Sequence, residues 1–108
     1  MFKVIRKEEL KFQMPRFTTR VQLYGDPEWG DYESLHSAMK RKGFTQTIKA
    51  DDGVEYYLPH AEYNREANVT GDEVLQDARE AAASVWDDFC VLVTESAGRT
   101  WHNLKTVK

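Results

Sequence analysis

The chain has 108 residues and a formal net charge of −3, which is enough length for one hydrophobic core and too little for two. Hydrophobic residues make up 41% and charged residues 31%, so the composition excludes a disordered chain, and no apolar run approaches the length of a membrane span. The mild negative charge excludes a general attraction to nucleic acid, so an RNA or DNA site needs a local group of basic side chains.

Residues 1–13 are expected to form a poorly ordered extension, and residues 14–108 a single domain. The extension is basic but lacks the continuous apolar stretch of a signal peptide. The only cysteine, Cys90, excludes an internal disulfide and fits a reducing compartment. We therefore expect a cytoplasmic protein in which Cys90, placed within an apolar run, is buried as a small hydrophobic residue.

The first elements are a strand and a helix. Over residues 17–24 apolar and polar side chains alternate, which predicts a strand with one buried face. A helix is predicted over residues 31–42, with Asp31 as its cap and a stripe of apolar side chains at helical spacing. Gly43 supplies the left-handed residue at which such a helix ends.

A hairpin and a second helix follow. Residues 45–49 and 54–58 flank Asp51-Asp52-Gly53, which predicts two strands joined by a tight turn. The polar stretch over residues 60–69 is expected to be a loop or an irregular continuation of the strand. Thr70, with Glu73 three residues later, then forms the capping box of a helix over residues 70–85.

The last elements complete the fold prediction. Residues 89–94 read as a strand that is apolar on both faces, and residues 95–99 turn the chain into a second strand over 100–107. The order β-α-β-β-α-β predicts an α+β, ferredoxin-like sandwich: an antiparallel sheet with both helices on one face, plus a C-terminal β-hairpin. The hairpin would cover the edge of the last strand; alternatively, that edge would form a homodimer with a second copy.

The first candidate site is the run of residues 59–65, in which His60, Glu62 and Tyr63 stand close together. Cleavage of RNA needs a group that deprotonates the 2′-hydroxyl and groups that stabilise charge on the phosphate. We predict His60 as the general base or acid, with Glu62 and Tyr63 assisting or orienting it. A polar loop held together by its own hydrogen bonds is the alternative interpretation.

The second candidate site is a set of residues that could bind RNA, because they combine basic charge with aromatic rings that stack on bases. Arg99 and Trp101 stand together after the last strand, and Arg20 and Tyr24 share the polar face of the first strand. Arg65 is a further basic candidate. Arg99 and Trp101 could equally form a hairpin tip that covers the core. No histidine or cysteine pair has the spacing of a metal site, so no metal and no cofactor are expected.

Four segments carry a family resemblance. They are Asp31-Tyr32-x-x-Leu35-His36-x-x-Met39, Gly43-Phe44-x-x-x-Ile48, Tyr57-Leu58-Pro59-x-Ala61-Glu62-Tyr63-Asn64 and Val91-Leu92-Val93-Thr94-Glu95. Over residues 16–104 the chain resembles small bacterial and prophage proteins of the GhoS type of antitoxin, ferredoxin-like endoribonucleases whose fold is similar to that of a CRISPR-associated protein. The resemblance implies a cytoplasmic endoribonuclease of a toxin–antitoxin system that cleaves single-stranded RNA, the messenger of its partner toxin.

Two other functions stay open. The first is a non-enzymatic phage or prophage module that binds and inhibits a host protein, with exposed aromatic residues as its anchors. The acidic composition and the lack of a recognisable catalytic motif favour it. The second is a purely structural or dimerisation domain, which would follow from the unpaired sheet edge.

Overall fold

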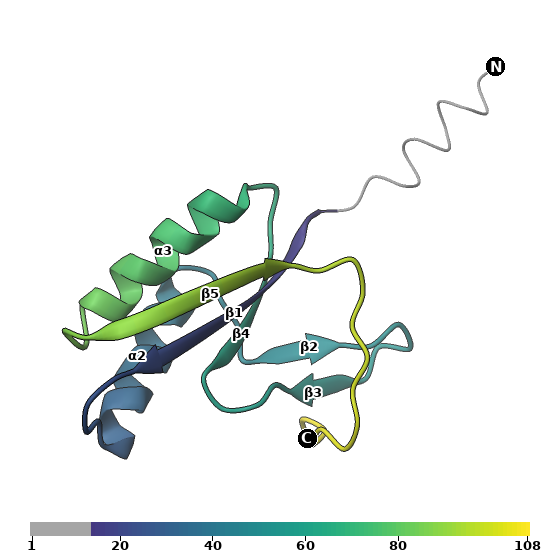
Figure 1. Cartoon of the computed structure of the whole chain (residues 1–108). Coiled ribbons are helices and arrows are strands. Elements are labelled where there is room, and N and C mark those ends of the chain that lie inside the picture. The colour runs from purple at the N-terminus through teal and green to yellow at the C-terminus, as the bar shows by residue number, and fades with distance from the viewer. Residues whose placement is uncertain (1–13) are drawn as a thin grey trace.

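The computed structural model describes residues 14–108, and the extension predicted for residues 1–13 lies outside the described residues. Figure 1 shows the arrangement of the elements. They follow in the order β1 (Arg16–Leu23), α2 (Trp29–Arg41), β2 (Thr47–Lys49), β3 (Glu55–Tyr57), β4 (Glu62–Glu66), α3 (Gly71–Ala83) and β5 (Phe89–Glu95). The predicted α+β class is confirmed. Neither of these two helices is long and apolar enough to cross a membrane.

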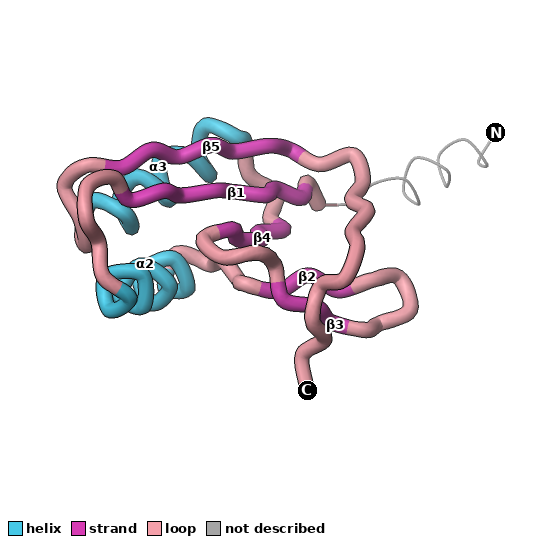
Figure 2. The backbone as a smooth tube through the Cα atoms, turned by 60° about the horizontal axis from the view of Figure 1, so that its bottom comes forward, coloured by secondary structure: helices cyan, strands magenta, loops and turns pink. Residues whose placement is uncertain are grey.

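β1 is the central strand of a three-stranded antiparallel sheet with the order β4-β1-β5. Arg20 of β1 faces Glu62 of β4 on one side and Leu92 of β5 on the other. β2 and β3 form a separate antiparallel hairpin, which reaches the sheet through a bridge between Thr45 and Asn64. Figure 2 shows this hairpin beyond β4, with the C-terminal segment passing alongside it.

The core lies on the face of the sheet that carries the odd-numbered residues of β1. Phe17, Val21 and Leu23 are buried there. Both helices pack against this face with the apolar stripes that their sequences predict: Leu35, Ala38 and Met39 from α2, and Val74, Ala78, Ala81 and Ala82 from α3. Small side chains in α3 allow close contact with β5 and β1. The even-numbered residues of β1 therefore face away from the helices, on what we call the outer face.

The structure departs from the prediction in two segments. Residues 60–69, expected to be mainly loop, contain β4, the strand that pairs with β1. Only Tyr63 of β4 is buried, so the segment lacks the apolar alternation that marks a strand. The predicted C-terminal hairpin is absent, because residues 96–108 contain no strand. This segment crosses to β3 instead, where Tyr56 and Thr106 form a bridge.

β5 also departs from the prediction. Phe89, Val91 and Val93 pack against the core, whereas Cys90 and Leu92 lie exposed on the outer face. The expectation that Cys90 is buried is therefore wrong, because nothing in the described residues covers this part of the face. β5 is an edge strand of the three-stranded sheet. The homodimer through this edge stays a prediction.

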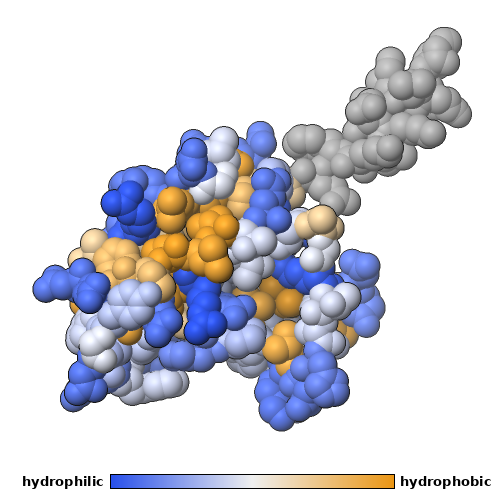
Figure 3. All heavy atoms as spheres, viewed as in Figure 1, coloured by the Kyte–Doolittle hydropathy of each residue, from blue (hydrophilic) through white to orange (hydrophobic). Residues whose placement is uncertain are grey.

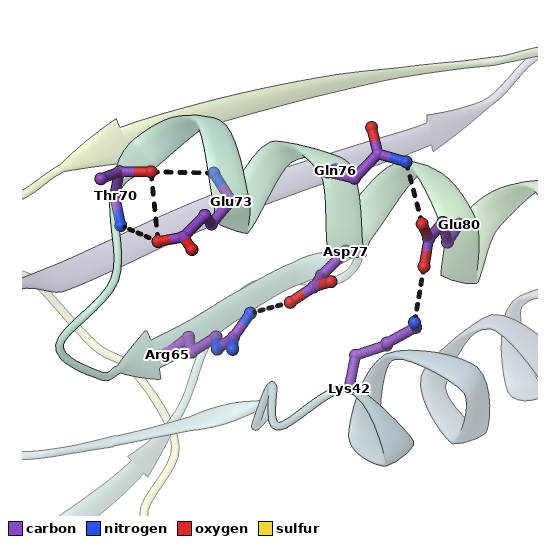
Figure 4. A network of polar contacts seen from close by, with 7 residues as sticks. All are labelled: Lys42, Arg65, Thr70, Glu73, Gln76, Asp77 and Glu80. Carbon is purple, nitrogen blue, oxygen red and sulfur yellow. Dashed lines mark hydrogen bonds and ion pairs between the residues drawn. The ribbon is translucent and has the colours of Figure 1, made fainter.

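The helix caps fix where the helices begin. Thr70 caps α3 as predicted, and its side chain accepts a hydrogen bond from the backbone of Glu73. α2 starts two residues earlier than predicted: Glu28 is its cap, and Asp31 lies in the first turn and accepts a hydrogen bond from the backbone nitrogen of Glu28. Figure 4 shows the α3 cap beside two ion pairs of the same helix, Arg65–Asp77 and Lys42–Glu80, both with 2.7 Å between their charged atoms.

These two ion pairs are expected to differ in their effect on stability. Arg65 is more buried than Lys42, so removal of its partner by Asp77→Ala leaves a poorly hydrated cation and is expected to lower the free energy of unfolding by about 2 kcal/mol. Glu80→Ala, in the solvent-exposed pair, is the matched control and is expected to lower the free energy of unfolding much less. Urea unfolding of both variants measures the difference, and equal losses would contradict this ranking.

Candidate active site

A cleft of about 350 Å³ lies between α2 and the turn that leads into β4. Its walls carry aromatic, basic and acidic side chains: Trp29, Glu33, His36, Ser37 and Lys40 from α2, Gln46 from the segment before β2, and His60 from the turn. Trp29, Glu33, His36 and Lys40 share one face of α2 because they are spaced by three or four residues. The cleft thus combines two histidines, a lysine and an exposed aromatic ring.

His36 is fixed in place by a buried phenol. Its Nδ1 lies 2.7 Å from the hydroxyl oxygen of Tyr63, a side chain that is only 1% exposed. Burial raises the pKa of Tyr63 well above its usual range, so the phenol keeps its proton. Nδ1 of His36 is the one hydrogen-bond partner of this hydroxyl among the described residues, and a buried O–H without an acceptor is costly. We therefore assign the hydroxyl as the donor to Nδ1, which places the proton of neutral His36 on Nε2, away from Tyr63.

The environment of His36 also favours its neutral form. Burial lowers the pKa of His36, and the nearby ring of His60 lowers it further, whereas the carboxylate of Glu33 acts in the opposite direction. At neutral pH His36 is consequently an uncharged hydrogen-bond donor at one wall of the cleft.

Within residues 14–108 the side chain of His60 contacts aromatic rings and makes no hydrogen bond. Its ring stacks on Trp29 with 5.6 Å between centroids and 18° between planes. The centroids of Tyr32 and His36 lie 4.5 and 6.0 Å away. The backbone reverses just after His60, since Ala61 has a φ of 65°, a left-handed conformation that costs energy for a residue with a Cβ. The turn therefore places His60 over α2 immediately before β4 begins.

The three residues predicted to be catalytic lie on two faces of the sheet. His60 and Tyr63 face α2, and Tyr63 acts on His36 rather than on solvent. Glu62 faces Arg20 on the outer face. It lines a hollow there together with Arg99 and Trp101. The structure brings His60 and Tyr63 to one site and places Glu62 elsewhere.

The residues predicted to bind RNA are also divided. Arg20, Arg99 and Trp101 lie on the outer face, with Arg99 bonded to Thr18 and Asn64. Arg65 faces the helices, where it pairs with Asp77 and lies over the ring of Phe44. Tyr24 follows the other end of β1 and lines a separate pocket with Trp86.

Sequence reasoning missed three residues of the cleft: His36, Trp29 and Lys40. The sequence contains a signal that could have found them, because Trp29, Tyr32, His36 and Lys40 recur at helical spacing beside the apolar stripe. The contact between His36 and His60 joins residues 24 positions apart, and only the packing of the turn on α2 reveals it.

We expect His36 to make stability depend on pH. The unfolded imidazole titrates near its usual value of 6.5, and the folded one below it, so between these values the unfolded state binds more protons. The free energy of unfolding should thus fall as the pH falls below about 6.5. His36→Gln should remove this contribution. Urea unfolding of the wild type and the variant between about pH 5 and 7.5 measures the difference, and parallel curves would contradict the expectation.

Comparison with known proteins adds no relative from which a role could be carried over. No family model matches this sequence, and no curated protein matches it. The functional assignment of the cleft therefore depends on the side chains that line it and on their chemistry.

Proposed function

We propose that this protein is an endoribonuclease that cleaves single-stranded RNA in the cleft between α2 and the His60 turn. The observation that carries the proposal is the convergence of two histidines with a lysine in one cleft, one of the histidines being held by a buried phenol. Histidine is the side chain best suited to proton transfer at neutral pH, and a nearby cation stabilises charge on a phosphate.

The cleft residues take distinct parts in the reaction. His60 removes the proton of a 2′-hydroxyl, whose oxygen attacks the adjacent phosphorus and forms a cyclic phosphate. The bond from phosphorus to the 5′-oxygen breaks, and that oxygen takes a proton from water while His60 returns its own proton to solvent. His36 donates its Nε2 proton as a hydrogen bond to a phosphate oxygen, and Lys40 adds positive charge. Tyr63 acts as a positioning residue for His36.

Trp29 supports a single-stranded substrate. Its side chain is 68% exposed although it is large and apolar, and one face of the ring is occupied by His60. The other face is free to stack on a nucleobase, which is available for stacking only when the base is not paired within a duplex.

The biological setting is proposed from the family resemblance. The GhoS-type antitoxins that the chain resembles imply a toxin messenger as substrate and the cytoplasm as location. We likewise propose that the fold is the ferredoxin-like sandwich. In this interpretation the second strand of that fold consists only of Thr45, which forms a single bridge with Asn64 of β4. Across the sheet the order is β5, β1, β4 and then Thr45, which supports the proposed fold. The packing of both helices on one face of the sheet supports it too.

Cleavage of a mixed pool of single-stranded RNA tests the proposal. His60→Gln is expected to lower the cleavage rate by about 10²- to 10⁴-fold, because it removes the proton acceptor while keeping a polar side chain. His36→Gln is expected to lower the rate by a smaller factor. His102→Gln is the matched control, since His102 is exposed in the C-terminal segment and lines neither the cleft nor the hollows of the outer face.

Three results would contradict the proposal: activity that disappears on further purification, full activity in His60→Gln, or an equal loss in His102→Gln. Parallel assays with EDTA decide whether a divalent ion takes part.

The alternative of a module that inhibits a host protein has one observation in its favour. Trp29 and Leu92 are exposed by 68% and 65%, and large exposed side chains of this kind anchor protein interfaces. They lie on opposite faces of the sheet, however, so no single patch joins them. Inactive protein that captures a host protein through Trp29 would favour this alternative.

A further inference from the structure

A second polar cavity, of about 210 Å³, lies on the outer face of the sheet, between β1 and the β2–β3 hairpin. We call it the outer cavity. Three cationic side chains and one carboxylate line it, together with an aromatic ring: Arg16, Lys49, Arg99, Asp51 and Trp101. Figure 3 shows the face of the molecule opposite the helices, where apolar side chains and strongly hydrophilic ones lie beside each other.

Arg99 is anchored at this cavity by neutral hydrogen-bond acceptors. Its Nε donates to the hydroxyl of Thr18 at 3.1 Å, and its Nη2 to the backbone oxygen of Phe17 at 3.2 Å and to the side-chain oxygen of Asn64 at 2.7 Å. All three acceptors are neutral. Among the described residues no hydrogen bond is made by its Nη1, so this nitrogen remains able to donate to a ligand.

The neighbouring charges leave the cavity positive. Burial lowers the pKa of Arg99, and the adjacent charge of Arg16 lowers it further, which places two guanidinium groups within electrostatic reach of each other. Glu66 opposes this effect. The two ion pairs found among residues 14–108 involve neither Arg16, Lys49 nor Arg99. A bound phosphate would relieve the repulsion and fill the unused donors.

The outer cavity extends toward the His60 turn along the outer face of the sheet. It shares Arg99 and Trp101 with an adjoining hollow, whose wall reaches Pro59 and Glu62. His60, in the cleft, stands between these two residues in the chain. Asn64, which accepts a hydrogen bond from Arg99, is four residues from His60, so their Cα atoms are at most roughly 13 Å apart, and closer because the chain turns at Ala61. A strand of RNA that leaves the cleft over the turn at Pro59 would therefore meet Arg99 within a few nucleotides.

We propose that the outer cavity is a phosphate-binding subsite for the RNA strand beyond the point of cleavage, formed by Arg16, Lys49 and Arg99, with Trp101 stacking on a base beside it. The inference rests on the proposed function, because it takes RNA as the ligand. Arg99 supplies a directed donor, whereas Arg16 and Lys49 contribute charge.

The test is the binding of 2′-O-methyl RNA of about 12 nucleotides, which lacks the attacking hydroxyl and so is bound without being cut. Arg16→Gln combined with Lys49→Gln is expected to weaken RNA binding by about tenfold at low salt. The double variant is also expected to bind with a weaker salt dependence: the slope of log K against log salt should fall in magnitude by about 0.7 for each phosphate that the protein no longer neutralises. Arg41→Gln combined with Arg79→Gln removes equal charge elsewhere, from exposed helix positions, and is expected to leave the salt slope unchanged. Arg99 is retained because it joins β1 to β4 and its removal could unfold the chain.

The outcomes separate this inference from the proposed cleavage. Protein that binds RNA through Arg16 and Lys49 but never cuts it would contradict the nuclease and support the subsite. Protein that cuts RNA but has the same affinity and salt slope in both double variants would overturn the subsite alone. A direct second measurement is the NMR signal of the Arg99 Nε–H during titration with inorganic phosphate, and a signal that does not move would also overturn the subsite.

Discussion

The antiparallel pairing of β4 with β1 determines where the candidate functional side chains lie. Successive residues of a strand point to opposite faces, so the register that places Tyr63 beside Thr19 in the core places Asn64 beside Thr18 on the outer face. Tyr63 then holds His36, and Asn64 holds Arg99. A shift of one residue in this register would exchange the two faces and dismantle both sites together. The five residues of β4 thus connect a cleft suited to proton transfer with a cavity suited to phosphate.

The core makes this arrangement rigid at the cleft. Tyr63 belongs to the same buried cluster as Leu35 and Met39 of α2, so the phenol and the helix that carries His36 move little relative to each other. His60 is the exception, since it depends on a turn with a left-handed alanine and on stacking with an exposed tryptophan. A proton-transfer group on such a turn can adjust to a substrate, whereas its neighbour His36 keeps the orientation that the core imposes.

The helices, their apolar faces and the central strand could be predicted from the sequence, because each is marked locally by the spacing of its apolar residues or by a capping residue. Phe17, Val21 and Leu23 alternate, and Thr70 and Glu73 form the expected box. β4 could not be predicted in this way, since Tyr63 is its single buried residue and its partners are remote in the chain. The same limit applies to the candidate site. His60 was found from its polar neighbours, but the pairing of His36 with Tyr63 depends on tertiary packing, as does the separation of Glu62 from both.

The charges show why composition is a poor guide to the ligand. The chain is acidic as a whole, but the binding of an anionic ligand depends on whether the individual basic side chains are already paired with carboxylates. Arg65 lies 2.7 Å from the carboxylate of Asp77, which neutralises most of its charge, so Arg65 stabilises the fold rather than binding an external anion. Arg99 is also well anchored, but its acceptors are a hydroxyl, an amide and a backbone carbonyl, which orient the guanidinium without neutralising it. An arginine that is oriented but not neutralised is preorganised for a phosphate, because the cost of ordering its side chain has already been met by folding.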